Sequence, residues 1–259
     1  MENARIAVIG GGLAGLSFSN AALYNGLRNV TVYEQAKEFR EIGAGISLSE
    51  NAFRCLDQYG LQEALLQVSN EHSAVNSARY ARWFRHYKTG ELLAISEFYE
   101  KPNRRIHRAH LLDVLRANLP HEMLKTNKRL LTIEKNDNDE KEYVLHFADG
   151  TNETADIVIG CDGIHSNVRK YLGIHDNPEY SGQVIYRGLL RPSSLPMETK
   201  DFLDLHLTFF RGHRSYYIAV YPIGRGENFR YNVGAFMTEP LSEFMLVFRT
   251  CIIQSSRHG

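Results

Sequence analysis

A glycine-rich loop near the N-terminus carries the first residues with chemical potential. Gly10, Gly12 and Gly15 are spaced as GxGxxG and follow the short apolar run 5–9. In this pattern the first glycine permits a tight turn, the second lets the backbone approach a pyrophosphate, and the third allows close packing of the next helix. The N-terminus of that helix offers N–H groups and a positive dipole end to phosphates. The spacing therefore predicts a nucleotide-binding loop, rather than a turn that serves only packing, with the binding residues Gly10, Gly12, Leu13, Ala14 and Gly15.

A carboxylate follows this loop at the distance that dinucleotide-binding domains use. Glu34 ends a second apolar stretch, 29–34, and lies 19 residues after Gly15. A carboxylate in this position accepts hydrogen bonds from ribose hydroxyls and repels a 2′-phosphate. Glu34 is therefore predicted to bind a ribose of the nucleotide.

A second motif, Cys161-Asp162-Gly163, follows the buried run 156–159. Asp162 can accept hydrogen bonds from hydroxyl groups of a bound nucleotide, and Gly163 keeps the turn open to a bulky ligand. The alternative for Asp162 is capping of the following helix, and both roles can coexist. Arg169 is expected to pair with Asp162 or to anchor the turn. Cys161 leaves a buried strand, so we interpret it as a packed thiol and not as a nucleophile.

Four segments in the same order resemble the FAD-dependent aromatic-ring monooxygenases, the single-component group that includes salicylate and hydroxybenzoate hydroxylases. They span roughly residues 6–170 and are Gly10–Gly15 with Glu34, Gly43–Ile46, Arg108–Leu111 with Leu115, and Cys161–Gly163 with Ser166 and Arg169. The resemblance implies an enzyme that binds FAD and uses NADH or NADPH as cosubstrate. It also implies that dioxygen adds to the reduced flavin, and that the resulting flavin hydroperoxide hydroxylates a small phenolic or carboxylate-bearing ring.

The resemblance also assigns cofactor roles to two further segments. Arg108 would place a permanent cation near the phosphate and ribityl part of FAD. Gly43 and Gly45 would let the backbone pass close to the flavin. A surface arginine and a plain loop are the respective alternatives.

The substrate residues implied by the resemblance lie further along the chain. Tyr186-Arg187 is similar to the Tyr-Arg pair at the start of the family's substrate sheet, and Arg187 could hold a substrate carboxylate. Tyr217 and Tyr221 are four residues apart, which places both on one face of a strand. A phenol hydroxyl can orient or deprotonate a substrate phenol, so both are predicted catalytic residues. The alternative is packing, because the chain contains 14 tyrosines.

The elements that must position these residues indicate an α/β protein. The predicted strands are 5–9, 29–34, 78–84, 92–95, 130–134, 143–147, 156–159, 183–190, 203–210, 216–221 and 229–236, and the predicted helices are 13–27, 49–59 and 108–119. Strand, helix and strand within about 30 residues predict a Rossmann-like parallel sheet. From residue 182 onward, strands without intervening helices predict an antiparallel substrate sheet. We therefore expect an FAD-binding domain at 1–180, with inserted strands around 78–95, a substrate-side sheet at 181–240, and an unplaced tail at 241–259.

Composition and charge exclude several other classes. Lys and Arg together number 30, as do Asp and Glu, so nothing in the net charge favours nucleic acid or an anionic membrane. No apolar run approaches the roughly 20 residues that cross a bilayer. The first strand begins directly after the N-terminus, which leaves no room for a signal peptide. The three cysteines suit a reducing compartment, and no pair of them has zinc-ligand spacing. His107 and His110 could share a helix face, but they lie beside three arginines, so a solvated polar face is expected there. We therefore expect a cytoplasmic protein without a metal.

The sequence departs from the family pattern after the substrate sheet. Family members continue by about a hundred residues and carry a Gly-Asp motif that binds the ribityl chain, whereas none of the 20 glycines here precedes an aspartate. We therefore expect a C-terminally shortened form with weak or absent FAD binding, doubtful activity and a tendency to self-associate. The alternatives are a non-catalytic flavin- or nucleotide-binding remnant and an NAD-dependent dehydrogenase.

Overall fold

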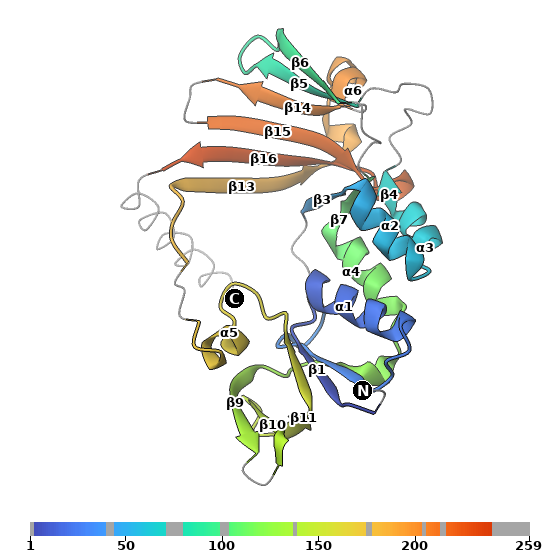
Figure 1. Ribbon diagram of the computed structural model, residues 1–259. Helices are drawn as coiled ribbons and strands as arrows, with labels where there is room; N and C mark the ends of the chain where they lie inside the picture. Colours follow the sequence, from blue (N-terminus) through green and yellow to red (C-terminus); the bar gives the residue numbers. More distant parts are fainter. Residues whose placement is uncertain are drawn as a thin grey trace. The chain divides into compact units, whose positions relative to one another are not determined.

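The chain forms two compact units in a computed structural model, which describes residues 3–39, 44–70, 80–98, 104–136, 139–174, 178–203, 206–212 and 216–239. The first unit comprises residues 1–43, 51–68 and 107–177, and the second comprises 44–50, 69–106 and 178–259. Figure 1 shows the elements of each unit, with labels on most of the helices and strands. The division at residues 180 and 240 stays a prediction.

The first unit is built on a parallel sheet with strand order β12-β1-β2-β8. Its strands are β1 (Ile6–Ile9), β2 (Val30–Tyr33), β8 (Leu124–Lys125) and β12 (Ile157–Gly160). β1 pairs in parallel with both β2 and β12, and all four of its residues are buried, as expected for a central strand. Helix α1 (Leu13–Tyr24) connects β1 to β2 and completes the βαβ unit. The Rossmann-like fold class predicted from the sequence is therefore confirmed.

Helix α1 is shorter than predicted. It ends at Tyr24 instead of continuing to Leu27, because Gly26 takes the left-handed conformation, with φ +85°. A glycine in this conformation commonly ends a helix, since only glycine adopts it without a steric cost. The N–H of Gly26 donates to the carbonyl of Leu23 at 3.1 Å and closes the last turn.

An antiparallel sheet forms the second layer of this unit. It consists of β9 (Leu130–Asn136), β10 (Asp139–Phe147) and β11 (Asn152–Ala155), in the order β11-β10-β9. The predicted hairpin is confirmed by the antiparallel pairing of β9 with β10. Side chains from this sheet and from the parallel sheet share one buried core, made of Ala7, Ile9, Tyr33, Leu130, Ile133, Leu145, Phe147, Ala155 and Val168.

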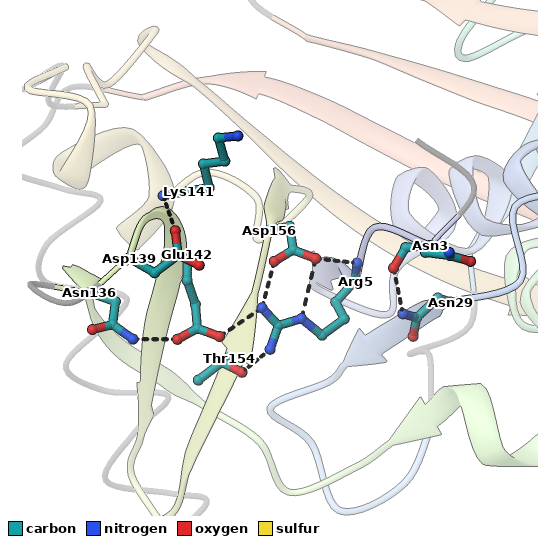
Figure 2. Close-up of polar contacts among 9 residues, drawn as sticks. All are labelled: Asn3, Arg5, Asn29, Asn136, Asp139, Lys141, Glu142, Thr154 and Asp156. Atoms are coloured by element: carbon teal, nitrogen blue, oxygen red, sulfur yellow. Dashed lines mark hydrogen bonds and ion pairs between the residues drawn. The ribbon is translucent and has the colours of Figure 1, made fainter.

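A polar network ties the start of β1 to this antiparallel sheet (Figure 2). The guanidinium of Arg5 donates to Asp156 at 2.5 and 3.2 Å and to Thr154 at 2.6 Å. It also pairs with Glu142 on β10 at 2.7 Å. The network links the residue before β1 to β10, to β11 and to the residue that precedes β12.

Besides α1, the described helices of this unit are α2 (Glu50–Gln58), α3 (Gln62–Val68), α4 (Arg108–Ala117), the 3-10 turn η1 (His121–Met123) and α5 (Asn167–Tyr171). The first residue of α2, Glu50, belongs to the second unit. α1 and α4 are joined through Asn20, whose side-chain amide donates to the carbonyl of Leu115 at 2.9 Å. Asn118 in turn donates to the Asn20 side-chain oxygen at 2.7 Å. Asn20 is only 1% exposed, so these bonds satisfy a buried amide. α3 was not predicted.

The second unit contains a six-stranded sheet with order β13-β16-β15-β14-β5-β6. Its strands are β13 (Gln183–Leu190), β16 (Arg230–Thr238), β15 (Tyr216–Ile223), β14 (Leu207–Arg211), β5 (Tyr80–His86) and β6 (Leu92–Phe98). Its pairs are antiparallel except for β14 with β5, which confirms an antiparallel sheet layer. A smaller sheet joins β3 (Gly45–Leu48), β7 (Arg104–His107) and β4 (Ser69–Asn70), and the 3-10 turns are η2 (Pro192–Ser194) and η3 (Gly226–Asn228).

One sequence prediction in this unit is wrong. Residues 203–210 were predicted as a strand, with no helix between it and the strand at 183–190. Helix α6 (Met197–Leu203) occupies the start of that segment, and β14 begins only at Leu207. The carbonyl of Pro196 accepts hydrogen bonds from Thr199 at 3.1 Å and Lys200 at 3.3 Å, which starts the helix. Leu203 is buried with Val220 and Tyr231. It was predicted to lie in a strand, but it is the last residue of helix α6.

Candidate nucleotide-binding groove

The glycine loop lies directly against the Cys161-Asp162-Gly163 turn. Gly10 has φ +102°, and its N–H donates to the carbonyl of Tyr33 at 2.9 Å. A Cβ atom on Gly10 would lie 2.3 Å from the carbonyl oxygen of Cys161. The N–H of Cys161 donates to the carbonyl of Ile9 at 2.8 Å, which holds the two turns together. Only glycine fits at position 10.

The other two glycines of the motif differ in what surrounds them. A Cβ on Gly15 would lie 1.9 Å from the carbonyl oxygen of Gly10, so Gly15 allows α1 to pack under the loop. A Cβ on Gly12 would meet no atom within 4 Å, which leaves the backbone open at this point. Gly12 is the N-cap of α1 and provides no side-chain hydrogen bond to the first turn. The N–H groups of that turn can therefore bind an anion.

A groove of about 830 Å³ opens beside these turns, within the first unit. Its lining includes most of the predicted cofactor residues, namely Gly10, Gly12, Leu13, Ala14, Glu34, Arg108, Asp162 and Gly163. Gly15 lies under the loop instead. Gly45 belongs to the second unit, and Gly43 is outside the described residues. The structure thus brings together two motifs that are about 150 residues apart in the sequence.

Glu34 is held by backbone donors in this structure. One carboxylate oxygen accepts from the N–H of Gly11 at 2.7 Å, and the other accepts from the N–H of Ala36 at 2.8 Å. Glu34 therefore fastens the glycine loop to the end of β2. Each carboxylate oxygen can accept a second hydrogen bond, so a ribose hydroxyl can still be bound.

Asp162 caps helix α5, which was the alternative role considered for it. Its carboxylate accepts from the hydroxyl of Ser166 at 2.6 Å and from the backbone N–H groups of Asn167 at 2.7 Å and Val168 at 3.3 Å. Gly163 follows with φ +78° and open space where a Cβ would stand. The capping bonds hold the turn in shape, and the glycine keeps its outer side accessible to a ligand.

Cys161 lines the groove, but its thiol is not activated. Burial raises the pKa of Cys161 above its ordinary value, and the negative charge of Asp162 raises it further. The thiolate is the reactive form of cysteine, so a raised pKa makes the group a poor nucleophile at neutral pH. This agrees with its interpretation as a packed thiol.

Several cations line the groove that sequence reasoning did not identify. Arg108, the first residue of α4, was predicted, whereas Lys128, Arg129 and Lys170 were not. Lys128 forms an ion pair with Asp149 at 2.8 Å, which lowers the pKa of that carboxyl to about 2. No motif spacing marks these cations, because they come from the segment before β9 and from α5.

The groove has the groups that an adenine dinucleotide requires. The first turn of α1, four cationic side chains and the Glu34 carboxylate all line it. Helix N-terminal N–H groups and cations favour phosphates, and a carboxylate accepts hydrogen bonds from ribose hydroxyls. Among the described residues, no cluster of three His, Cys, Asp or Glu side chains could hold a metal ion. In the same part of the chain, no helix is long and apolar enough to cross a membrane.

The predicted substrate residues lie on the six-stranded sheet of the second unit. Strand register places Arg187 on the same face as Tyr217 and Tyr221, and Tyr186 on the opposite face. Tyr217 stacks on Phe236, with ring centroids 4.4 Å apart and an interplanar angle of 10°. Tyr186 is 45% exposed, and its hydroxyl is 3.4 Å from Glu239. Neighbouring residues of one strand cannot share a face, so Tyr186 and Arg187 do not form one binding surface.

Tyr221 has a structural contact that the sequence did not predict. Its hydroxyl donates to the carbonyl of Gly45 at 3.0 Å, while the N–H of Gly45 donates to the side-chain oxygen of Asn232 at 2.7 Å. A Cβ on Gly45 would lie 2.9 Å from atoms of Tyr221, Asn232 and Ile223. Strand β3 is therefore anchored to the sheet by hydrogen bonds to both polar groups of one glycine.

Comparison with known proteins agrees with this geometry. Residues 3–237 match the family model described as FAD binding domain. The chain is 38% identical over 203 residues to 6-methylsalicylate 1-monooxygenase of Aspergillus terreus (strain NIH 2624 / FGSC A1156), covering 71% of this chain and 44% of that protein. It is 37% identical over 199 residues to 3-amino-4-hydroxybenzoate 2-monooxygenase PtmB3 of Streptomyces platensis, covering 74% and 47%.

The fold comparison leads to the same group of proteins. The structure of 2,6-dihydroxypyridine-3-hydroxylase from Arthrobacter nicotinovorans matches with a TM-score of 0.75 and 25% identity, covering 91% of this chain and 56% of that one. The chain spans about half the length of the curated relatives it matches. The family match over residues 3–237 and the groove that joins its two motifs give one conclusion. The chain belongs to the FAD binding domain family.

Proposed function

We propose that the first unit binds FAD in the groove between the glycine loop and the Asp162 turn. The observation that carries this proposal is the contact of Gly10 with Cys161, which makes one groove from two separate motifs. The pyrophosphate binds at the first turn of α1, where the N–H groups and the helix dipole favour negative charge. Arg108 adds a permanent positive charge, and Glu34 accepts a hydrogen bond from the ribose.

We propose that the protein as a whole hydroxylates a small aromatic compound. Bound FAD supplies the redox chemistry, which includes accepting a hydride from NADH or NADPH and activating dioxygen. The printed names of the relatives include a methylsalicylate and an aminohydroxybenzoate, so the proposed substrate is a ring that bears a hydroxyl and a carboxylate. On the sheet face that they share, Arg187 attracts the carboxylate and Tyr217 orients the ring.

The test combines binding with turnover. The purified chain is titrated with FAD and with ADP, and oxidation of NADH and NADPH is then followed with and without salicylate, 4-hydroxybenzoate and 6-hydroxynicotinate. In contrast to the weak or absent FAD binding expected from the missing Gly-Asp motif, the proposal expects FAD to bind much more tightly than ADP. It also expects one aromatic acid to stimulate oxidation of the reduced nucleotide. A chain that binds neither FAD nor ADP contradicts the assignment of the groove.

A second candidate function is nucleotide binding without catalysis. The specific observation in its favour is that every residue lining the groove belongs to the first unit. It expects FAD and ADP to bind with similar affinity, and no aromatic acid to stimulate NADH or NADPH oxidation. The third candidate function is that of an NAD-dependent dehydrogenase. In that case NAD should bind more tightly than FAD.

Location and assembly also remain proposals. We propose a cytoplasmic location, because three sparse cysteines suit a reducing compartment. Self-association is proposed from the exposed apolar side chains Leu92, Leu93 and Ile95 on β6. Sedimentation velocity over a range of concentrations tests the second proposal, and a concentration-independent monomer contradicts it.

A further inference from the structure

Arg129 is one of the cationic residues that line the groove. It is exposed and lines the groove together with its neighbours Lys128 and Leu130. The N–H of Lys128 donates to the backbone carbonyl of Glu34 at 2.8 Å. The backbone that carries Arg129 therefore lies beside Glu34, the residue that is proposed to bind the ribose.

The backbone at Arg129 is fixed on its other sides as well. The carbonyl of Arg129 accepts from the N–H of Ala148 at 2.9 Å. The carbonyl of Leu130 accepts from the side-chain amide of Asn167 at 2.8 Å. A long side chain on a fixed backbone can meet a ligand without ordering the loop first, which lowers the entropic cost of binding.

The other unpredicted cations of the groove are already engaged. The ammonium group of Lys128 lies 2.8 Å from Asp149 and 2.5 Å from Thr151. The ammonium group of Lys170 lies 3.1 Å from the side-chain oxygen of Asn167. Within the described part of the chain, the guanidinium of Arg129 has no such hydrogen bond or ion pair. It is thus the unpredicted cation of the groove whose donors are available to a ligand.

Because Arg129 lies close to Glu34, it is expected to contact the ribose or base end of a dinucleotide and not the pyrophosphate. The pyrophosphate belongs at the first turn of α1, whereas the ribose and its base belong beside Glu34. A guanidinium is planar and weakly hydrated, and it stacks on aromatic faces. Next to Glu34, the aromatic group available is the purine base.

We propose that Arg129 recognises the adenine base of the bound dinucleotide by stacking its guanidinium on the ring. The inference rests on the proposed function, because it requires the groove to hold an adenine nucleotide. Arg129 is then a determinant of base preference, while Arg108 and the first turn of α1 bind the phosphates.

The experiment compares two nucleotides that share a diphosphate but differ in the base. Calorimetry measures the affinities of ADP and UDP, and flavin fluorescence measures the affinity of FAD, for the wild type and for Arg129→Gln and Arg129→Lys. Arg54→Gln and Arg54→Lys are matched controls, since Arg54 is exposed on α2 and does not line the groove. Thermal unfolding shows that each variant is folded.

If Arg129 stacks on the adenine ring, both variants should bind ADP and FAD roughly two- to fivefold more weakly than the wild type. Their preference for ADP over UDP should fall by a similar factor. Arg129→Lys does not restore binding, because an ammonium lacks the planar surface. An equal loss for ADP and UDP that Arg129→Lys rescues identifies a phosphate contact and overturns the assignment. Unchanged affinities in both variants overturn it as well, whereas a wild type that binds neither ADP nor FAD contradicts the proposed function itself.

Discussion

The backbones of Gly10 and Cys161 are in contact where β1 and β12 end, and both residues line the groove. The space for a Cβ on Gly10 is taken by the carbonyl of Cys161, 2.3 Å away, and φ at Gly10 is +102°. Both the backbone conformation and the neighbouring carbonyl exclude a larger residue. The relationship joins the dinucleotide loop to the Asp162 turn.

Replacing Gly10 with Ala should destabilise the first unit and abolish nucleotide binding. The left-handed conformation alone costs about 1–2 kcal/mol for a residue with a Cβ. The clash with Cys161 should raise the total loss above about 3 kcal/mol. Gly26→Ala is the matched control, because Gly26 has φ +85° but open space where its Cβ would stand. Urea unfolding and FAD titration of both variants are the measurements; similar losses would show that the contact with Cys161 is unimportant.

Asp156→Asn should make the stability of the chain less dependent on pH below about pH 4. Hydrogen bonds from Arg5 lower the pKa of Asp156 from its ordinary 3.8 to about 2. Because the folded-state pKa is depressed, the stabilisation is fully present above the unfolded pKa and is lost as the pH falls through about 2. The variant lacks this contribution at neutral pH and has less to lose in acid.

The measurement is urea unfolding of wild type and Asp156→Asn between pH 7 and pH 2. Glu122→Gln serves as the control, since Glu122 is exposed on η1 and outside the Arg5 network. Parallel stability curves for wild type and Asp156→Asn across this range would contradict the role given to the Arg5–Asp156 pair.

Tyr221→Phe should reduce stability, whereas Tyr217→Phe should not. The hydroxyl of Tyr221 donates to Gly45, and a lost hydrogen bond of this kind costs about 1 kcal/mol. Tyr217 is held by ring stacking on Phe236, which a phenylalanine retains. Thermal unfolding of both variants provides the comparison. A Tyr221→Phe variant of unchanged stability that loses all hydroxylation would support the original prediction of a catalytic tyrosine instead.

Cys161 should react slowly with iodoacetamide at neutral pH and be protected by FAD. Burial raises its pKa, so alkylation should accelerate only at alkaline pH. Cys55 is exposed and outside the groove, which makes it the internal reference in a Cys251→Ser background. Peptide mass spectrometry follows both sites. If FAD slows alkylation at Cys55 as much as at Cys161, the ligand does not occupy this groove specifically.

The sequence alone determined the elements whose signals are local. The GxGxxG spacing predicted a turn and a helix start because glycine conformations and helix capping depend on neighbouring residues. Apolar runs predicted β1, β2 and β12, and β13 was predicted with its observed bounds, Gln183–Leu190. The prediction around residue 203 was wrong, because alternating apolar residues from Leu203 onward suit a strand, and only the tertiary structure shows that Leu203 ends a helix and packs on Val220 and Tyr231.

The tertiary structure decided which distant residues meet. No spacing in the sequence places Arg129 on the groove or joins Tyr221 to Gly45, because those contacts depend on how separate strands are arranged in space. It also showed that the Asp162 carboxylate caps α5, a role that the motif allowed but did not require. Local backbone chemistry thus determined the kind of ligand that the chain is built to bind. The long-range packing of β1 against β12, and of the segment before β9 against Glu34, determined where the groove lies and which side chains line it.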